Sequence, residues 1–131
     1  MLVEPVHVFH QTLVLGVKRL VDVVGPAHAS EILFSARRFS AEEALRMGLV
    51  NRVVPKTELE QTVRELALEV AANAPLVLRA AKAAIQESLR DPEVRDTERC
   101  RRLVETCFES DDYAEGRRAF AEKRAPIFQG R

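Results

Sequence analysis

The chain of 131 residues is long enough for one domain with one hydrophobic core. Hydrophobic residues make up 47% of it, charged residues 31%, and 20 basic side chains balance 20 acidic ones. This composition is typical of a globular protein in solution, and a net charge of zero gives no bulk attraction to nucleic acid or to an anionic membrane. No apolar run approaches the roughly 20 residues of a membrane helix, and the first residues carry no basic residue ahead of an apolar core, so we expect no secretory signal. We therefore expect a cytoplasmic protein with neither membrane nor nucleic acid as partner.

Residues 1–24 differ from the rest of the chain. They are rich in Val and Leu, are interrupted by Pro5 and Gly16, and alternate untidily, so they indicate short extended pieces more than a helix. His7 and His10 are three residues apart and could share a helix face as metal ligands, but no third ligand stands nearby. We interpret them as structural histidines and predict no metal site.

From residue 25 onward the helix signals are clear. Pro26 suits the first position of a helix, which we expect over 27–34. Ser40 stands three residues before Glu43, which is the spacing of a capping box. This pattern predicts a helix of two turns over 41–47.

The end of that short helix is marked by Gly48, which is suited to a left-handed stop. The β-branched sequence "LVNRVV" at 49–54 then predicts a short strand, closed by Pro55.

A second capping box, Thr57 with Glu60, predicts the start of a long helix. Apolar residues recur there at spacings of four, three and four, and the helix should end near Asn73, before Pro75. The apolar face consists of Leu59, Val63, Leu66 and Val70.

The next helix is expected over 76–90. Its predicted inward side chains are Leu78, Ala81, Ile85 and Leu89. Its predicted outward side chains are Arg79, Lys82, Gln86 and Arg90.

Two further helices complete the predicted fold. Asp91 and Pro92 restart the chain, and Ser110 caps a last helix whose first turn is acidic and whose last turn is basic. Cys100 and Cys107 lie about 10 Å apart along one apolar stripe, which is too far for a disulfide between them. The fold class is therefore mainly α, with a short strand in the N-terminal third.

Two groups of residues that contain cations are candidates for ligand binding. The arginines of 99–102 are interleaved with acidic residues, which is typical of a solvated, ion-paired helix and argues against a nucleic-acid surface. Phe120 and Lys123 are three residues apart, and a ring beside a cation suits the base and phosphate of a nucleotide. Alternatively, Phe120 packs against another helix and Lys123 is solvated.

From about Gly16 to Arg131 the sequence resembles the C-terminal portion of the crotonase superfamily, the enoyl-CoA hydratases and isomerases. The resemblance is carried by "GVKRLVDVVGPAHASEILFSARRFSAEEALRMGLVNRVVP", "ANAPLVLRAAKAAI" and "CFESDDYAEGRRAFAEKRAPIFQGR". It implies a helical oligomerisation domain at 25–131, a remnant or altered N-terminal segment at 1–24, and absence of the spiral β-βα core. The short capped helix and the strand after it would then be the joint between spiral and helices.

The resemblance also implies a function. It places the chain in the acyl-CoA metabolism of fatty or aromatic acids, as a homo-oligomer built on trimers. Phe120 and Lys123 match positions that reach coenzyme A bound in an adjacent subunit, so a coenzyme A thioester is the expected ligand, with no other cofactor.

The catalytic groups of the family are not matched by these residues. Both N–H donors for the thioester oxygen and the first acidic residue come from sequence upstream of the matched part, and the second glutamate position falls on Pro5, with Glu4 one step away. We therefore assign no catalytic residue and expect a C-terminal fragment that lacks hydratase activity. The alternative is a non-catalytic oligomerisation or interaction module.

Overall fold

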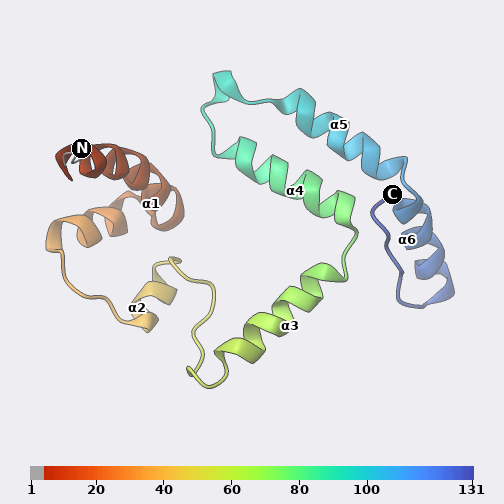
Figure 1. The fold of residues 1–131 in the computed structure, drawn as a ribbon, viewed down its shortest axis with the longest axis horizontal. Coiled ribbons are helices and arrows are strands. Elements are labelled where there is room, and N and C mark those ends of the chain that lie inside the picture. Colours follow the sequence, from red (N-terminus) through yellow and green to blue (C-terminus); the bar gives the residue numbers. More distant parts are fainter. Residues whose placement is uncertain (1–4) are drawn as a thin grey trace. The chain divides into compact units, whose positions relative to one another are not determined.

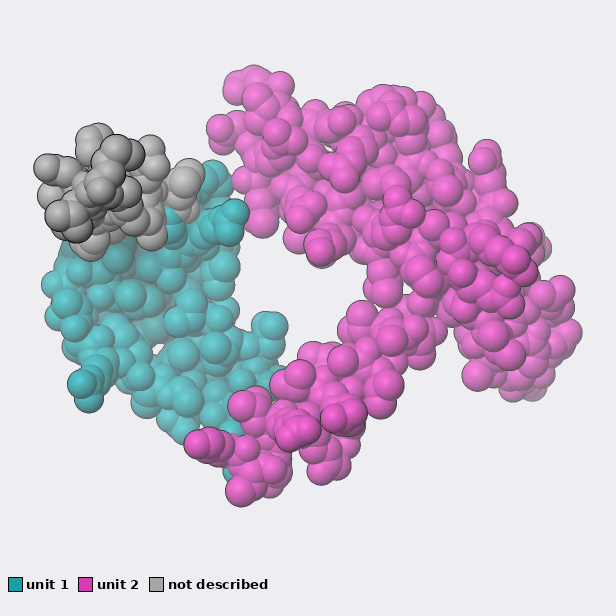
Figure 2. All heavy atoms as spheres, viewed as in Figure 1, with its two compact units in different colours: residues 1–55 teal, residues 56–131 magenta. Residues whose placement is uncertain are grey.

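A computed structural model describes the backbone of residues 5–131 and the side chains of residues 16–131. This part of the chain is helical with no strand, which confirms the mainly α class (Figure 1). It divides into two compact units, residues 1–55 and residues 56–131 (Figure 2). None of the described helices is long and apolar enough to cross a membrane.

The first unit begins with α1, Pro5–Ser35, which is interrupted at Gly25. Gly25 has φ 76° and ψ 165°, outside the helical region, so Pro26 opens a new helical run as predicted. The expectation of extended structure before residue 25 is wrong for residues 5–24, where the backbone is helical. The β-branched and leucine residues there carry no alternation strict enough to oppose a helix. Residues 1–4 and the side chains of His7 and His10 lie outside the described part.

The short helix α2, Ala41–Arg46, has the predicted capping box. The Glu43 N–H donates to Ser40 Oγ at 3.2 Å, and the Ser40 N–H donates to Glu43 Oε2 at 2.8 Å. Gly48 has φ 76°, so the predicted left-handed stop is also confirmed.

Arg37 connects α2 to α1. Its guanidinium donates to Glu31 and to Glu43, at 2.9 Å each, and its carbon lies 3.8 Å from the centre of the Phe39 ring. These contacts lower the pKa of Glu43, with the Arg37 hydrogen bond as the largest cause.

The strand predicted at 49–54 is wrong. The N–H groups of Leu49 and Val50 turn back to the carbonyl oxygen of Ala44, at 2.9 and 3.4 Å. A strand requires a neighbouring strand to accept and donate its backbone hydrogen bonds, and residues 5–131 contain no strand that could pair with this segment.

The second unit is a series of helices. They are α3 (Leu59–Ala71), α4 (Pro75–Ser88), the 3-10 helix η1 (Pro92–Val94), α5 (Thr97–Phe108) and α6 (Asp111–Glu122).

The predicted capping box at the start of α3 is absent. Glu58 is the N-cap residue, in the αR region, and no side chain caps the helix there. The apolar face of α3 is exposed, with exposed fractions between 43% for Leu66 and 57% for Val63. No other helix of the second unit covers that face in the described chain.

Helix α4 packs against α5 through a different face from the predicted one. Ala80, Ala83 and Glu87 are buried, whereas Ile85 and Leu89 of the predicted inward face are 62% and 53% exposed. The two alanines let the helices approach closely, which larger side chains on the other face would prevent.

The buried Glu87 organises the turn from α4 to α5. Its carboxylate accepts from the Asp96 N–H at 2.8 Å and from Arg90 at 3.1 Å, and these bonds lower its pKa. Asp96 in turn caps α5, because its side chain accepts from the Arg99 N–H at 2.8 Å.

The arginines of α5 form the ion pairs expected from the sequence. Arg101 pairs with Glu98 at 2.6 Å and also with Glu105, and Arg102 lies 3.4 Å from Glu98. All of these side chains are exposed, as on a solvated helix.

Candidate functional site

The candidate site lies along α6 and the segment that follows it. Ser110 caps the helix as predicted, accepting from the Tyr113 N–H at 3.1 Å, and two aspartates occupy the acidic first turn. The helix ends at Glu122, so the predicted basic last turn is wrong: Lys123 is the C-cap, in the left-handed region with φ 53°. The cations Lys123 and Arg124 therefore follow the helix instead of closing it.

Phe120 and Lys123 both lie at this C-terminal end of α6. The Phe120 side chain is 88% exposed, so it does not pack against another helix in the described chain. Lys123 is exposed and forms no ion pair with any described residue. Since Lys123 is not helical, its spacing of three from Phe120 does not place both side chains on one helix face.

A groove of about 640 Å³ borders Phe120. It is formed by α4, α5, α6 and the C-terminal segment, and its lining is almost entirely apolar. Side chains that line it include Val77, Ala81, Val104, Phe108, Tyr113 and Phe128. Phe108 and Tyr113 meet edge to face, with ring centres 5.1 Å apart. Arg117 is the only cation among the described residues that line the groove.

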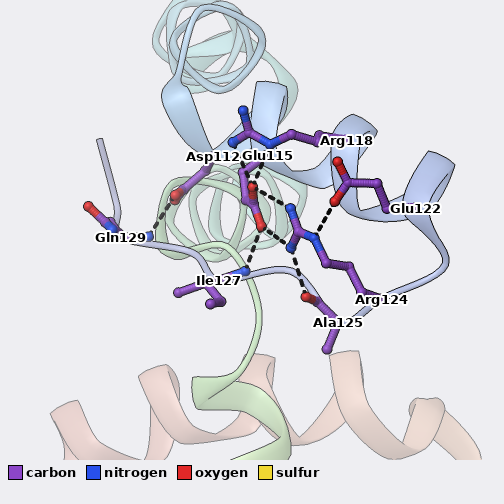
Figure 3. Close-up of polar contacts among 8 residues, drawn as sticks. All are labelled: Asp112, Glu115, Arg118, Glu122, Arg124, Ala125, Ile127 and Gln129. Atoms are coloured by element: carbon purple, nitrogen blue, oxygen red, sulfur yellow. Dashed lines mark hydrogen bonds and ion pairs between the residues drawn. The ribbon is translucent and has the colours of Figure 1, made fainter.

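The C-terminal segment, residues 124–131, is bound back along α6 (Figure 3). We call the set of bonds made by Asp112 and Glu115 to this segment the tail clamp. Asp112 is 3% exposed, and its carboxylate accepts from the N–H groups of Gln129 at 2.6 Å and Gly130 at 2.8 Å. Glu115 accepts from the Ile127 N–H at 3.1 Å.

Gly130 is required at its position in the clamped segment. Its φ is 77°, in the left-handed region, and an added Cβ would lie 3.4 Å from the ring carbons of Pro75. The clamp thereby holds the C-terminus against the start of α4 and keeps Phe128 in the wall of the groove.

Glu115 also forms ion pairs with an arginine of α6 and with one of the tail (Figure 3). It lies 2.7 Å from Arg118 and 2.6 Å from Arg124, and Arg124 lies 2.6 Å from Glu122. Arg124, then Arg118, then the Ile127 N–H hold the pKa of Glu115 well below its usual range. The same pairs raise the pKa of Arg124, with Glu115 as the main cause.

Sequence reasoning missed the tail clamp. Its hydrogen bonds join residues 17 and 18 positions apart, for Gln129 and Gly130 with Asp112. The periodicity of apolar residues along a helix does not predict contacts between residues so far apart in the sequence. The only sequence signal was the short polar run "SDDYAEG" opposite a final glycine.

The comparisons with known proteins agree with this structure. The family model for enoyl-CoA hydratase/isomerase matches residues 12–131. Carnitinyl-CoA dehydratase of Salmonella typhi is 42% identical over 124 residues, which cover 88% of this chain and 46% of that protein.

Solved structures give the same result. Enoyl-CoA hydratase from Bacillus anthracis has a TM-score of 0.79 and 34% identity, over 88% of this chain and 45% of that one. Enoyl-CoA hydratase from Mycobacterium marinum has a TM-score of 0.78 and 32% identity, over 88% and 46%. The chain thus spans about half the length of the relatives it matches. Matched over nearly its whole length, the chain belongs to the enoyl-CoA hydratase/isomerase family.

Proposed function

We propose that this chain is part of a protein that acts in the acyl-CoA metabolism of fatty or aromatic acids. Its helices contact coenzyme A and neighbouring subunits, and the 131 residues do not themselves catalyse hydration. The observation that carries the proposal is the 88% exposure of Phe120 at the end of a helix whose own tail is clamped in place. A large exposed ring on a helix whose tail is held in place is suited to a ligand with a flat face.

Coenzyme A offers such a face in its adenine, with phosphates close by. Stacking of a base on an aromatic side chain contributes about 1–3 kcal/mol. The Lys123 ammonium, which has no acidic partner among the described residues, is available to a phosphate. Phe120 and Lys123 are therefore the proposed coenzyme A contacts.

Calorimetric titration with coenzyme A tests these contacts. Phe120→Ala and Lys123→Ala should each weaken binding relative to the unmodified chain. Phe34→Ala is the matched control, because Phe34 is 85% exposed but lies in the first unit. Binding that is the same in all four proteins would refute the role of Phe120 and Lys123.

The large exposed apolar surface of the chain supports assembly into a homo-oligomer. The resemblance implies a trimer or a multiple of it. The buried hydrophobic residues of the described chain are few and mostly small: Val24, Ala29, Ala80, Ala83 and Ala119. Many large apolar side chains are exposed instead, including the whole predicted face of α3. Contiguous apolar surface of this kind marks contact with another polypeptide. This observation also favours the second candidate function, an oligomerisation module without ligand.

The chemical part of the proposal is tested by enzyme assay. Hydration needs two N–H donors aimed at the thioester oxygen and acidic residues that move protons, and we assign none of these here. We expect no hydration of crotonyl-CoA by the 131-residue chain, followed as loss of the enoyl thioester absorbance. Turnover comparable to that of a complete enoyl-CoA hydratase would contradict the proposal. Self-association without coenzyme A binding would favour the oligomerisation module.

A further inference from the structure

We propose that Arg117 is a phosphate-binding residue that acts on the same coenzyme A molecule as Phe120. The inference rests on the proposed function, which places coenzyme A at the C-terminal end of α6. It adds a residue that the family resemblance did not point to.

The position of Arg117 fits this role. Arg117 and Phe120 are three residues apart inside α6, so their Cβ atoms are neighbours on one face, roughly 5–6 Å apart. Both side chains also line the apolar groove. A base stacked on Phe120 thus has a guanidinium within one helical turn, on the side toward Ser110.

The ion pairs made by Glu115 and Glu122 single out Arg117 among the arginines of this region. Arg118 and Arg124 are each bound to Glu115, at 2.7 and 2.6 Å, and Arg124 is also bound to Glu122. Arg117 is exposed and forms no ion pair with any described residue. Its N–H donors are therefore available to an anion, whereas Arg118 and Arg124 already donate to Glu115.

The groove favours an anionic partner for Arg117. The one acidic residue among the described groove residues, Asp112, is buried and accepts two backbone N–H groups of the tail. Its carboxylate oxygens are thus already engaged by the tail and do not pair with Arg117. A guanidinium matches two phosphate oxygens with two parallel N–H bonds, which a lysine does not.

Titration of the 131-residue chain with coenzyme A, followed by amide chemical shifts in NMR, tests the inference. Arg117→Gln should weaken binding about fivefold, as for an ion pair near the surface. Arg118→Gln removes the same charge one residue away, but from a guanidinium already paired with Glu115, so its affinity should stay within about twofold.

A second titration, with adenosine, separates phosphate recognition from other effects. Adenosine has the base without phosphates, so Arg117→Gln should bind it as the unmodified chain does. An equal loss for adenosine and for coenzyme A would overturn the phosphate role. If Arg117→Gln weakens the binding of coenzyme A but not of 3′-dephospho-coenzyme A, the phosphate role is supported and the 3′-phosphate is the partner. If the variant weakens the binding of both, the phosphate role is supported and the diphosphate is the partner.

The outcomes distinguish this inference from the function on which it rests. If Phe120→Ala weakens coenzyme A binding and Arg117→Gln does not, the inference fails and the proposed function stands. If the unmodified chain does not bind coenzyme A, both fail.

Discussion

Two helices of the second unit, α3 and α6, differ in what holds them in place. α6 carries its own cap at Ser110 and is bound to the tail through the buried Asp112 and through Glu115. α3 has no side-chain cap, and its apolar face is exposed along its whole length.

The contrast separates two ways in which a helix is stabilised. Isolated helices of about 13 residues are marginal in water, so α3, with 13, needs a surface that covers its apolar face. α6 is fixed by directed bonds within the chain, which suits a helix that presents Phe120 to a ligand. Assembly would thus determine the stability of α3, and local polar contacts that of α6.

The largest expected effect concerns the face of α3. Leu66→Lys places a charge in an apolar face, so we expect it to abolish self-association, because burying an unpaired charge in an interface is strongly unfavourable. Light scattering after size-exclusion chromatography measures the mass. Gln61→Lys is the control, since Gln61 lies on α3 among polar residues and donates to Glu65 at 2.8 Å. A mass that is the same for the unmodified chain and both variants would show that this face makes no contact.

The next largest effect is expected at Asp112. Asp112→Ala leaves the N–H groups of Gln129 and Gly130 without their acceptor, which should lower the free energy of unfolding by about 1–3 kcal/mol. Urea denaturation measures the change, and hydrogen exchange at the Gln129 and Gly130 amides locates it. Asp111→Ala is the matched control, because the Asp111 side chain lies in the same first turn but is 83% exposed, and its contact with the tail is an exposed ion pair with Arg131 at 3.8 Å, which contributes little to stability. If both variants lose the same free energy of unfolding, the effect comes from the charge near the helix N-terminus and not from the tail clamp.

Substitution of two glycines by alanine should change the free energy of unfolding in opposite directions. Gly130→Ala forces a Cβ into the left-handed region beside Pro75 and should lower the free energy of unfolding by about 1 kcal/mol. Gly116→Ala in the middle of α6 should raise it by up to about 1 kcal/mol, because the added Cβ meets Phe128 at an ordinary contact distance of 3.7 Å. Thermal unfolding measures both. A loss of stability in both variants would mean that the wall around Phe128 cannot accept a methyl group.

The smallest expected effect is the titration of Glu115. Its pKa in the folded chain lies well below the ordinary value of 4.5, so its contribution to stability is complete above that pH and is lost as the pH falls toward the folded-state pKa. Carboxyl NMR should show a titration midpoint that rises in Arg124→Gln and is unchanged in Arg117→Gln. A midpoint at the ordinary value in the unmodified chain would show that the ion pairs do not persist in solution.

The parts of the fold that were predictable depend on neighbours in sequence. The capping box at Ser40, the stop at Gly48 and the cap at Ser110 are local hydrogen-bond patterns, and all three are confirmed. The family itself was also recognisable from runs of sequence, and the match over residues 12–131 confirms it.

The parts that failed depend on tertiary partners. The segment 49–54 has β propensity but no strand beside it, so its first amides return to α2. On α4, the apolar pattern allows two faces, and the face that packs inside the chain contains a buried glutamate, Glu87, which no hydrophobic pattern selects.

The candidate site was predictable only in part. Phe120 and Lys123 were candidates from their spacing and chemistry and again from the resemblance, and their role stays a prediction. Arg117 could not be distinguished from Arg118 by sequence, because the difference is that Glu115 pairs with one of them.

Hydrogen exchange of the 131-residue chain at increasing protein concentration tests most directly whether α3 depends on assembly and α6 does not. Protection of the α3 amides should rise with concentration, while protection of the Gln129 and Gly130 amides should already be present in the dilute chain and stay constant. Protection of α3 that is strong and independent of concentration would contradict this account.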